Sequence, residues 1–248
     1  MDILEVKSLS KSFGGVAALK DVSFDVPEGQ IRGFIGPNGA GKTTLFSLIA
    51  GAVRPSAGNV ALRGGNITGK KPSALVKMGV VRTHQIVRPF RALTVLENVQ
   101  LAVHFGRDAV SSPVVAKERA MDALKLVGLD GKAKMLASAL SLGEQKRLEV
   151  ARALATAPSI LMLDEICGGL AVTETKTMLD LVCRIREGGT TVLYIEHDMK
   201  AVMSVCDTIT VLNFGQKLAE GKPEEIQNDH SVIEAYLGKS TLRTHTSG

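Results

Sequence analysis

The stretch that most constrains what this chain can fold into is Gly36-Pro37-Asn38-Gly39-Ala40-Gly41-Lys42-Thr43. It fits the pattern G-x-x-x-x-G-K-[ST] of a phosphate-binding loop, in which backbone N–H groups surround the phosphates and the lysine reaches the terminal ones. The apolar run before it, residues 31–35, predicts a buried strand, and Thr44 with the apolar residues after it predicts a helix that ends at Gly51. A strand, a glycine-rich loop and a helix N-terminus together direct the helix dipole and free N–H groups at a phosphate. This context favours a phosphate site over an ordinary glycine-rich turn.

The composition is that of a globular protein with a substantial core. The 248 residues suit one domain, or one domain with a subdomain, and 45% of them are hydrophobic. A formal net charge of +5 fits an anionic ligand or a position beside an acidic membrane surface. With only 4% aromatic residues and no long basic tract, we expect no nucleic-acid partner.

The cysteines and the N-terminal residues bear on the compartment. Cys167, Cys183 and Cys206 are an odd number without CxxC spacing, so we expect reduced thiols in apolar surroundings and a cytosolic protein. Residues 1–5 lack the charged and apolar regions of a signal peptide, and no apolar run approaches the roughly 20 residues of a membrane span. If the protein works at a membrane, we expect a partner to carry it there.

The order of the predicted elements indicates an α/β fold. Residues 3–9 and 16–26 predict an antiparallel pair of strands, and residues 94–156 predict helices alone, with no strand expected before Ser159. We therefore expect a helical insertion over about residues 86–158 in an α/β core that spans residues 1–238, followed by a polar tail at 239–248. Near the end, Asn213-Phe214-Gly215 predicts a hairpin turn, and residues 224–238 predict a last helix.

Two carboxylates follow one of the buried strands. Asp164 and Glu165 come directly after the apolar residues 160–163, and acids at such a position are costly unless they have a function or a partner. With a phosphate loop present, the economical assignment is Asp164 on Mg²⁺ through water and Glu165 polarising the attacking water. A purely structural pair of carboxylates is the alternative.

Gln85 and His197 stand at two further strand ends. A glutamine there could bind a metal-bound water, and a histidine beside the acids could contact a γ-phosphate. From these residues alone, a polar loop glutamine and a structural or solvent-facing histidine remain open.

Two other positions have both a plain and a functional interpretation. Phe13 could lie flat on a nucleobase or belong to the core. Ser141 and Glu144 form a capping box, which either caps a helix and does nothing else or presents a helix N-terminus to a phosphate. Gly143 would allow close approach in the second case.

Taken in order, these motifs resemble those of the nucleotide-binding subunit of ABC (ATP-binding cassette) transporters over roughly residues 1–238. The loop at 36–43 is similar to the Walker A motif, and Gln85 to the Q-loop glutamine. Residues 140–144 look like the signature motif, and residues 160–164 like the Walker B strand. Glu165 is similar to the catalytic base, and His197 to the switch histidine. The resemblance implies a P-loop NTPase (RecA-like) core with an antiparallel β subdomain and a helical signature subdomain.

The resemblance also implies ATP and Mg²⁺ as cofactors. The aromatic Phe13 would stack on adenine, and Ser141, Gly143 and Glu144 would face a nucleotide. The metal would be held by Thr43, Gln85 and Asp164. The phosphates would be bound by Gly36, Pro37, Asn38, Gly39, Ala40, Gly41, Lys42, Thr43 and Thr44.

The partners implied by the resemblance are other subunits of a transporter. Two cassettes pair head to tail, as a homodimer or a heterodimer, and the signature helix of one covers ATP held by the Walker A loop of the other. ATP binding and hydrolysis then move two transmembrane permease subunits, so the chain would be peripheral at the cytoplasmic face of the inner (plasma) membrane. Helices of the permeases would dock beside the Q-loop, in a groove lined by Val87, Arg88, Phe90 and Arg91.

Within the family, the chain resembles the branched-chain amino acid importer ATPases over residues 13–15, 35–46 and 224–238. This implies ATP-driven uptake and, indirectly, an extracytoplasmic solute-binding protein. Similar cassettes that serve urea uptake or lipopolysaccharide export are the alternatives for the solute. A soluble ABC ATPase in translation or DNA repair is the alternative function, although such proteins usually carry two cassettes or a long coiled-coil insertion. A P-loop kinase or GTPase would leave the signature helix and His197 unexplained.

Four residues depart from the general pattern of the family. Leu142 and Glu144 also occur in the branched-chain group, whereas Ile166 replaces a proline. Ala171 replaces an aspartate or asparagine that normally reaches across the dimer. We therefore hypothesise altered communication between the two ATP sites, with a heterodimer of unequal sites as one consequence. Equal ATP turnover at both sites of the purified transporter would remove this hypothesis.

Overall fold

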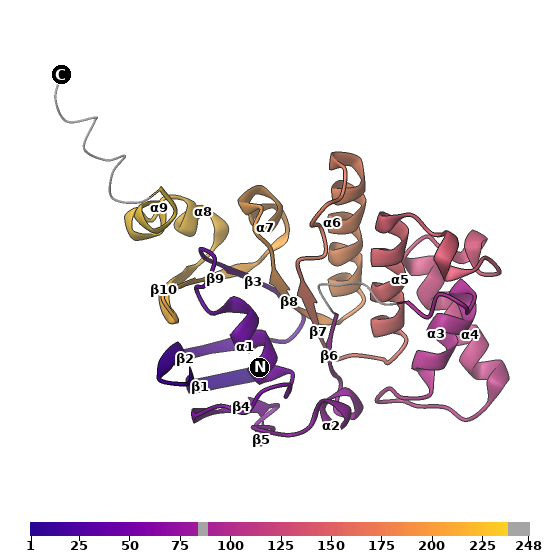
Figure 1. The fold of residues 1–248 in the computed structure, drawn as a ribbon, viewed down its shortest axis with the longest axis horizontal. Coiled ribbons are helices and arrows are strands. Elements are labelled where there is room, and N and C mark those ends of the chain that lie inside the picture. Colours follow the sequence, from indigo (N-terminus) through magenta and orange to yellow (C-terminus); the bar gives the residue numbers. More distant parts are fainter. Residues whose placement is uncertain (84–88, 238–248) are drawn as a thin grey trace. The chain divides into compact units, whose positions relative to one another are not determined.

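The computed structural model describes residues 1–83 and 89–237 (Figure 1). These residues divide into two compact units. The first unit combines Met1–Gly69 with the chain from Tyr194 onward, and the second is Lys70–Leu193. Both units contain strands and helices, so the predicted α/β class is confirmed. None of the helices in the described part of the chain is long and apolar enough to span a bilayer.

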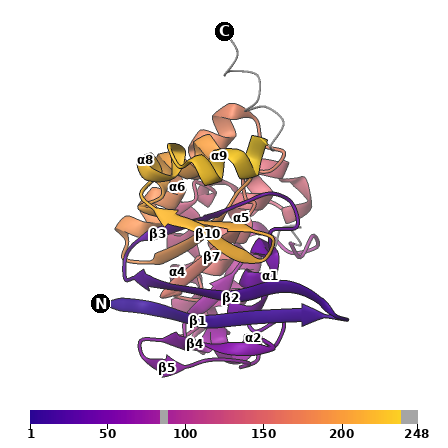
Figure 2. The same ribbon diagram turned by 90° about the vertical axis from the view of Figure 1, so that its left-hand side faces the viewer.

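The first unit begins with an antiparallel sheet, in which the predicted early strands are confirmed (Figure 2). Its order is β2-β1-β4-β5, with Val6 opposite Phe24 and Leu4 opposite Leu62. Alternation puts Leu4 and Val6 on the buried face. The strands are β1 Asp2–Phe13, β2 Val16–Pro27, β4 Ala57–Leu62 and β5 Gly65–Asn66.

The same unit holds three further strands: β3 Ile31–Ile35, β9 Thr208–Asn213 and β10 Gln216–Gly221. β3 runs parallel to β9, and β9 turns into β10 through the predicted hairpin, with Asn213 opposite Gln216. Phe34 of β3 packs between Phe24 and Phe46, with ring centroids 5.1 and 5.7 Å apart. The ring of Phe46 thereby anchors helix α1 Lys42–Ile49, which follows the phosphate loop, to the strand before it.

The other helices of the first unit lie near its C-terminal end, and they are α7 Met199–Val205, α8 Pro223–Gln227 and α9 His230–Leu237. The prediction of one helix over residues 224–238 is wrong, because two short helices cover that stretch. The first ends at Gln227, and Asp229 caps the second: its carboxylate accepts hydrogen bonds from the N–H groups of Ser231 and Val232. The short helix α7 was not predicted, although Asp198 carries its cap by accepting from the N–H of Lys200.

The second unit has three strands in the order β8-β7-β6, with β6 Val80–Arg82, β7 Ile160–Asp164 and β8 Thr191–Ile195. β6 and β7 run parallel, with Val81 opposite Leu161, and β8 continues across the boundary between the units. β7 is buried along its whole length, as expected for a central parallel strand.

Helices make up the rest of the second unit: α2 Pro72–Lys77, α3 Val95–Val103, α4 Pro113–Leu126, α5 Leu142–Leu154 and α6 Val172–Glu187. α3, α4 and α5 pack on one another through side chains such as Val99, Leu124 and Leu148 (Figure 1). The described residues from 89 to 159 contain no strand, which confirms their predicted helical character. The predicted boundaries of the domain and its insertion remain predictions.

Candidate functional site

The phosphate loop joins β3 to α1 in the first unit, as predicted. At its start, Gly36 has φ of 149°, and a Cβ there would be 2.1 Å from the carbonyl oxygen of Leu212. At its end, Gly41 has φ of 103° and occupies the N-cap position of α1 without a side-chain cap. No capping side chain therefore accepts hydrogen bonds from the first-turn N–H groups of α1, so these groups can donate to an anion.

Lys42, the lysine of this loop, is buried, with 5% of its surface exposed. Its ammonium group donates to the carbonyl oxygens of Gly36 at 2.6 Å and of Pro37 at 3.1 Å. A cation that is held by its own loop at a helix N-terminus creates a positive site that an anion would complement.

The remaining loop residues form the rim of the site. Asn38, Gly39 and Thr43 are exposed, Pro37 and Thr44 are half-buried, and Ala40 is buried. The structure thus brings the predicted loop residues together around Lys42.

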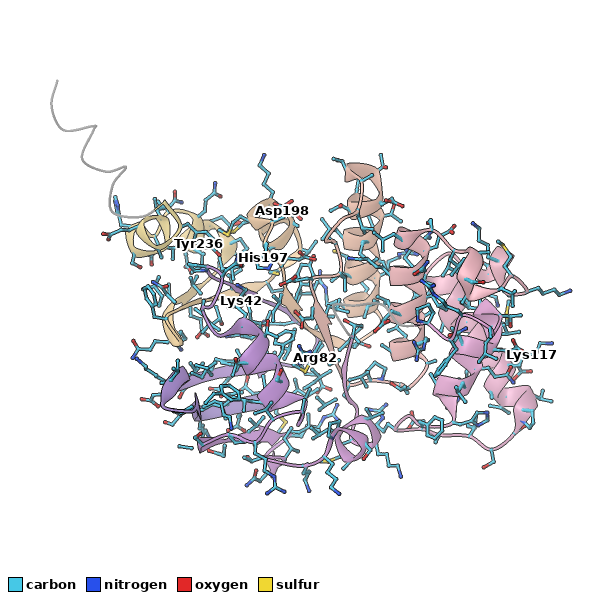
Figure 3. All side chains as sticks on the ribbon, viewed as in Figure 1. Lys42, Arg82, Lys117, His197, Asp198 and Tyr236 are labelled. Atoms are coloured by element: carbon cyan, nitrogen blue, oxygen red, sulfur yellow. The ribbon has the colours of Figure 1, made fainter. Side chains whose placement is uncertain are left out.

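His197 also belongs to the first unit (Figure 3). It follows β8 by two residues and is exposed, between the buried Glu196 and Asp198, whose carboxylate caps α7. The predicted position at a strand end is therefore correct, while the predicted phosphate contact remains a prediction.

Phe13 ends β1, and half of its surface is exposed. The ammonium group of Lys11 lies 4.9 Å from the centroid of its ring. The ring is outside the core, so the plain interpretation of Phe13 as a core residue is wrong, and an open aromatic face fits the predicted stacking on a base.

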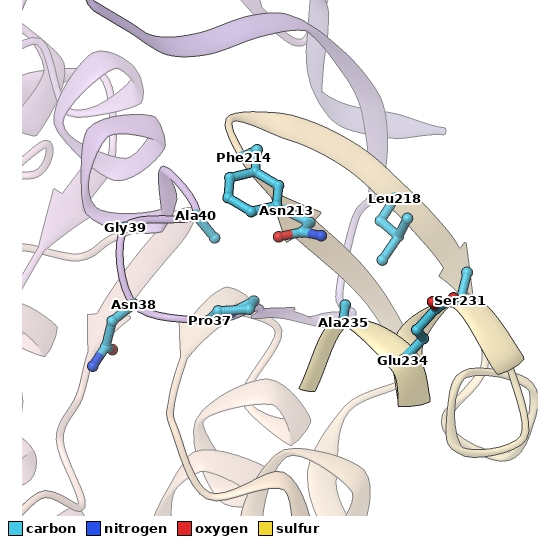
Figure 4. Close-up of a pocket in the computed structure, with 10 residues that line it drawn as sticks. All are labelled: Pro37, Asn38, Gly39, Ala40, Asn213, Phe214, Leu218, Ser231, Glu234 and Ala235. Carbon is cyan, nitrogen blue, oxygen red and sulfur yellow. The ribbon is translucent and has the colours of Figure 1, made fainter. Parts of the chain in front are cut away.

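A cavity of about 800 Å³ adjoins the phosphate loop (Figure 4). Its walls are the loop, the β9–β10 hairpin and helix α9, with Ala40, Phe214 and Ala235 among the lining residues. Burial raises the pKa of Tyr236 on α9, and the backbone N–H of Gly36, the first residue of the loop, opposes that rise.

In the second unit, Asp164 ends β7 with 2% of its surface exposed. Its Oδ2 accepts a hydrogen bond from Nη2 of Arg82 at 2.5 Å, whereas its Oδ1 is buried and has no hydrogen-bond partner among the described residues. Glu165 follows with φ of 52°, a left-handed conformation that is rare for glutamate. Backbone strain of this kind concentrates at functional sites, which supports a role for this turn.

The signature residues form the N-terminus of α5. Glu144 N–H donates to Ser141 Oγ at 3.3 Å, and the Glu144 carboxylate accepts from the N–H of Ser141 at 3.1 Å, so the capping box is confirmed. The hydrogen bond from Lys132 to this carboxylate at 2.5 Å is the main cause that lowers the pKa of Glu144. A role of Ser141 toward a phosphate remains a prediction.

Lys146, one turn later on α5, was missed in the sequence. It is buried and donates to the carbonyl oxygens of Glu165 at 3.3 Å and Gly168 at 2.6 Å. A buried lysine cannot be distinguished from a surface lysine of an amphipathic helix by its spacing alone. It joins the signature helix to the turn that carries the predicted catalytic base.

The turn after β7 leads to α6 through the residues that depart from the family pattern. Ile166 is buried, and Ala171 occupies the N-cap position of α6 without a side-chain acceptor. The Glu174 carboxylate accepts from the N–H of Ala171 at 3.1 Å and faces Gly143, where a Cβ would lie 2.5 Å from its Oε1. This half of a capping box replaces the cap that aspartate or asparagine would supply.

Gln85, Val87 and Arg88 lie outside the described residues. Of the other predicted docking residues, Arg91 and Phe90 are exposed, and the Phe90 ring lies 5.1 Å from the guanidinium carbon of Arg152. Residues 1–83 and 89–237 contain no group of three or more histidine, cysteine, aspartate and glutamate side chains that could hold a metal by themselves.

Family comparisons agree with this arrangement. Residues 19–168 match the family model described as ABC transporter, and residues 216–240 match the model described as branched-chain amino acid ATP-binding cassette transporter. The chain is 43% identical to the high-affinity branched-chain amino acid transport ATP-binding protein LivG of Salmonella typhimurium, with 96% of this chain and 98% of the relative covered. It is equally 43% identical, with the same coverage, to the corresponding protein BraF of Pseudomonas aeruginosa. Identity is 32%, again with 96% and 98% covered, to the lipopolysaccharide export system ATP-binding protein LptB of Haemophilus influenzae.

Solved structures show the same architecture. An ATP-binding cassette of an ABC transporter in its ADP conformation has a TM-score of 0.86 and 32% identity, with 96% of this chain and 100% of that chain covered. A dimeric cassette in a post-hydrolysis state, bound to ADP and Pi, has a TM-score of 0.78 and 28% identity, with 89% and 98% covered. With its phosphate loop, strand-end carboxylates and capped signature helix in the order described above, the chain belongs to the ABC transporter family, as one of its ATP-binding cassettes.

Proposed function

We propose that this chain is the ATP-hydrolysing subunit of a transporter that takes up branched-chain amino acids. One observation carries the choice of solute: the C-terminal residues 216–240 match the family model described as branched-chain amino acid ATP-binding cassette transporter. Support also comes from 43% identity to LivG against 32% identity to the lipopolysaccharide export protein.

In this proposal ATP binds with its phosphates against the loop at 36–44. The ammonium group of Lys42 turns from the carbonyl oxygens of Gly36 and Pro37 to the β- and γ-phosphates. The N–H groups at the start of α1 hold the same phosphates, and Phe13 stacks on the adenine through its open ring face.

The residues present fit Mg²⁺. Asp164 Oδ1 is a buried oxygen without a hydrogen-bond partner among the described residues, which suits an acceptor for a metal-bound water, and the exposed Thr43 lies in the first turn of α1. Gln85 is the third proposed ligand. When bound, the metal would neutralise charge on the β- and γ-phosphates and orient them for in-line attack.

Hydrolysis in this proposal depends on two residues at strand ends. Glu165 accepts a proton from the attacking water. Lys146 stabilises the turn of Glu165 by donating a hydrogen bond to its carbonyl oxygen. His197 donates a hydrogen bond to the γ-phosphate.

The chain acts as one half of a cassette dimer, with a second copy or a different cassette as its partner. The α5 N-terminus, with Ser141, Gly143 and Glu144, then covers ATP held by the partner's loop, because the helix dipole favours an anion there. The dimeric relative bound to ADP and Pi supports this assembly.

Two permease subunits would hold the dimer at the cytoplasmic face of the inner membrane, and an extracytoplasmic binding protein would deliver the solute. A cavity of about 430 Å³ in the second unit, lined by Phe105, Arg152 and Thr156 among others, supports such a docking surface, because Arg152 also lies beside the ring of Phe90. The exposed ring of Phe90, which contacts Arg152, extends that surface.

Uptake in the organism that encodes the chain tests this proposal. A strain without the gene should lose most high-affinity uptake of radiolabelled leucine, isoleucine and valine, and the wild-type gene should restore it, whereas a Lys42→Ala version should not. Unchanged amino acid uptake with a loss of urea uptake or of lipopolysaccharide at the cell surface would assign the cassette to one of those solutes. Unchanged transport of all three kinds would favour a soluble ABC ATPase.

A further inference from the structure

Arg82 ends β6, and Asp164 ends the neighbouring strand β7. The two strands are parallel, with Arg82 opposite Met162, so both side chains emerge at the same edge of the sheet. Nη2 of Arg82 lies 2.5 Å from Oδ2 of Asp164, and the two side chains are 15% and 2% exposed. This is the most deeply buried charge pair among the ion pairs described in the second unit.

The contact engages only one oxygen of the carboxylate. Arginine can bind both oxygens of a carboxylate with its planar fork, but Oδ1 of Asp164 has no partner among the described residues. A buried carboxylate with one oxygen fixed and the other unoccupied has a defined orientation. The backbone around it is fixed as well, since the N–H of Asp164 donates to Thr83 Oγ1 at 3.4 Å and the N–H of Thr83 donates to the Met162 oxygen at 2.9 Å.

We infer that Arg82 is a positioning residue for the metal site, which holds Asp164 Oδ2 so that Oδ1 is presented to a metal-bound water. This inference rests on the proposed function, because it requires that Asp164 takes part in Mg²⁺–nucleotide binding. Arg82 itself touches neither the metal nor the nucleotide. Partners of this kind, which orient a metal-binding carboxylate, typically contribute 10- to 100-fold to metal affinity.

The test separates metal-dependent from metal-independent binding. Calorimetry measures the affinity of the purified chain for AMP-PNP in excess Mg²⁺ and in EDTA, and the ratio of the two dissociation constants is the Mg²⁺ enhancement. We expect Arg82→Gln to reduce this enhancement by about tenfold while the affinity in EDTA stays within about twofold of the wild-type value. Arg82→Lys should recover part of it, because Asp164 uses only one nitrogen of the arginine.

Two further variants make the test specific. Asp164→Asn should remove the enhancement, and the double variant with Arg82→Gln should be no worse than Asp164→Asn alone, since both act on one interaction. Arg107→Gln is the matched control: its guanidinium donates to Ser159 Oγ, beside the opposite end of β7, so the enhancement should be unchanged. If Arg82→Gln does not fold, the Mg²⁺ enhancement of Arg82→Lys is compared with that of the wild type instead.

The outcomes distinguish the inference from the function on which it rests. A wild-type chain without Mg²⁺-enhanced binding of AMP-PNP would contradict the proposed function. Enhanced binding that Asp164→Asn removes but Arg82→Gln leaves unchanged would overturn the inference alone. A larger enhancement in Arg82→Gln would also overturn it, because it would mean that the arginine competes with the metal.

Discussion

The ammonium group of Lys42 lies 2.6 Å from the carbonyl oxygen of Gly36, the first residue of the loop that this lysine completes. The same ammonium group donates a second hydrogen bond to the carbonyl oxygen of Pro37 at 3.1 Å. The predicted phosphate-binding cation is therefore oriented by the backbone of its own loop.

Replacing Lys42 by alanine should weaken ATP binding at least about tenfold, or about 1.4 kcal/mol, because a cation on the β- and γ-phosphates is lost. Calorimetry with a slowly hydrolysed ATP analogue measures the change. Lys7→Ala is the matched control, since Lys7 is exposed and pairs with Glu5. Near-normal affinity of the Lys42 variant would count against the phosphate-loop assignment.

Phe13→Ala should weaken ATP binding by about 1–3 kcal/mol, the range for stacking of a base on an aromatic side chain. The half-exposed ring contributes little to the core, so thermal stability should change little. Phe214→Ala is the control, because Phe214 is an even more exposed aromatic residue of the same unit, at 82%. Equal loss of affinity in both variants would contradict the stacking role of Phe13.

Glu165→Gln should leave ATP binding intact and slow hydrolysis at least about a hundredfold, near 2.7 kcal/mol of barrier. Glutamine keeps the size of the side chain, and its amide cannot accept a proton from water at neutral pH. Single-turnover measurements with the assembled transporter separate the chemical step from binding and release. Unchanged turnover would show that the base is another residue.

Tyr236→Phe tests the contribution of the Tyr236 phenol, on the C-terminal helix α9, to stability. Burial raises the pKa of Tyr236 above its ordinary value of 10.0, so the neutral phenol stabilises the fold below the unfolded-state pKa, and this contribution disappears as the pH rises through the folded-state value. The stability difference between wild type and variant, from urea unfolding, should therefore be largest at about pH 8 and should shrink above about pH 10. A difference that does not depend on pH would contradict this account.

The fold and the main site motifs could be predicted because they are local patterns. Continuous apolar runs identified β3 and β7, and spacing identified the phosphate loop and the capping box at Ser141. The break between α8 and α9 had a readable signal in Asp229, a good N-cap residue, but the apolar spacing continues through it.

Contacts between distant segments could not be predicted in the same way. The pairs Arg82–Asp164 and Lys146–Gly168 depend on which strand ends and helices become neighbours, and no single local pattern contains both partners. Ala171 is an intermediate case: the sequence identified the replacement of an aspartate or asparagine, and the structure adds that Ala171 is the N-cap residue of α6 and that Glu174 accepts a hydrogen bond from its N–H. The hypothesis of unequal ATP sites remains open to the turnover test.

Purification of the tagged chain from its own membranes in mild detergent tests the central claim most directly. If the chain powers a transporter, mass spectrometry should identify two polytopic membrane proteins and a cassette partner, in amounts comparable to the chain itself. Recovery only in the soluble fraction, alone or with ribosomes or DNA, would contradict the transport function and would favour a soluble ABC ATPase.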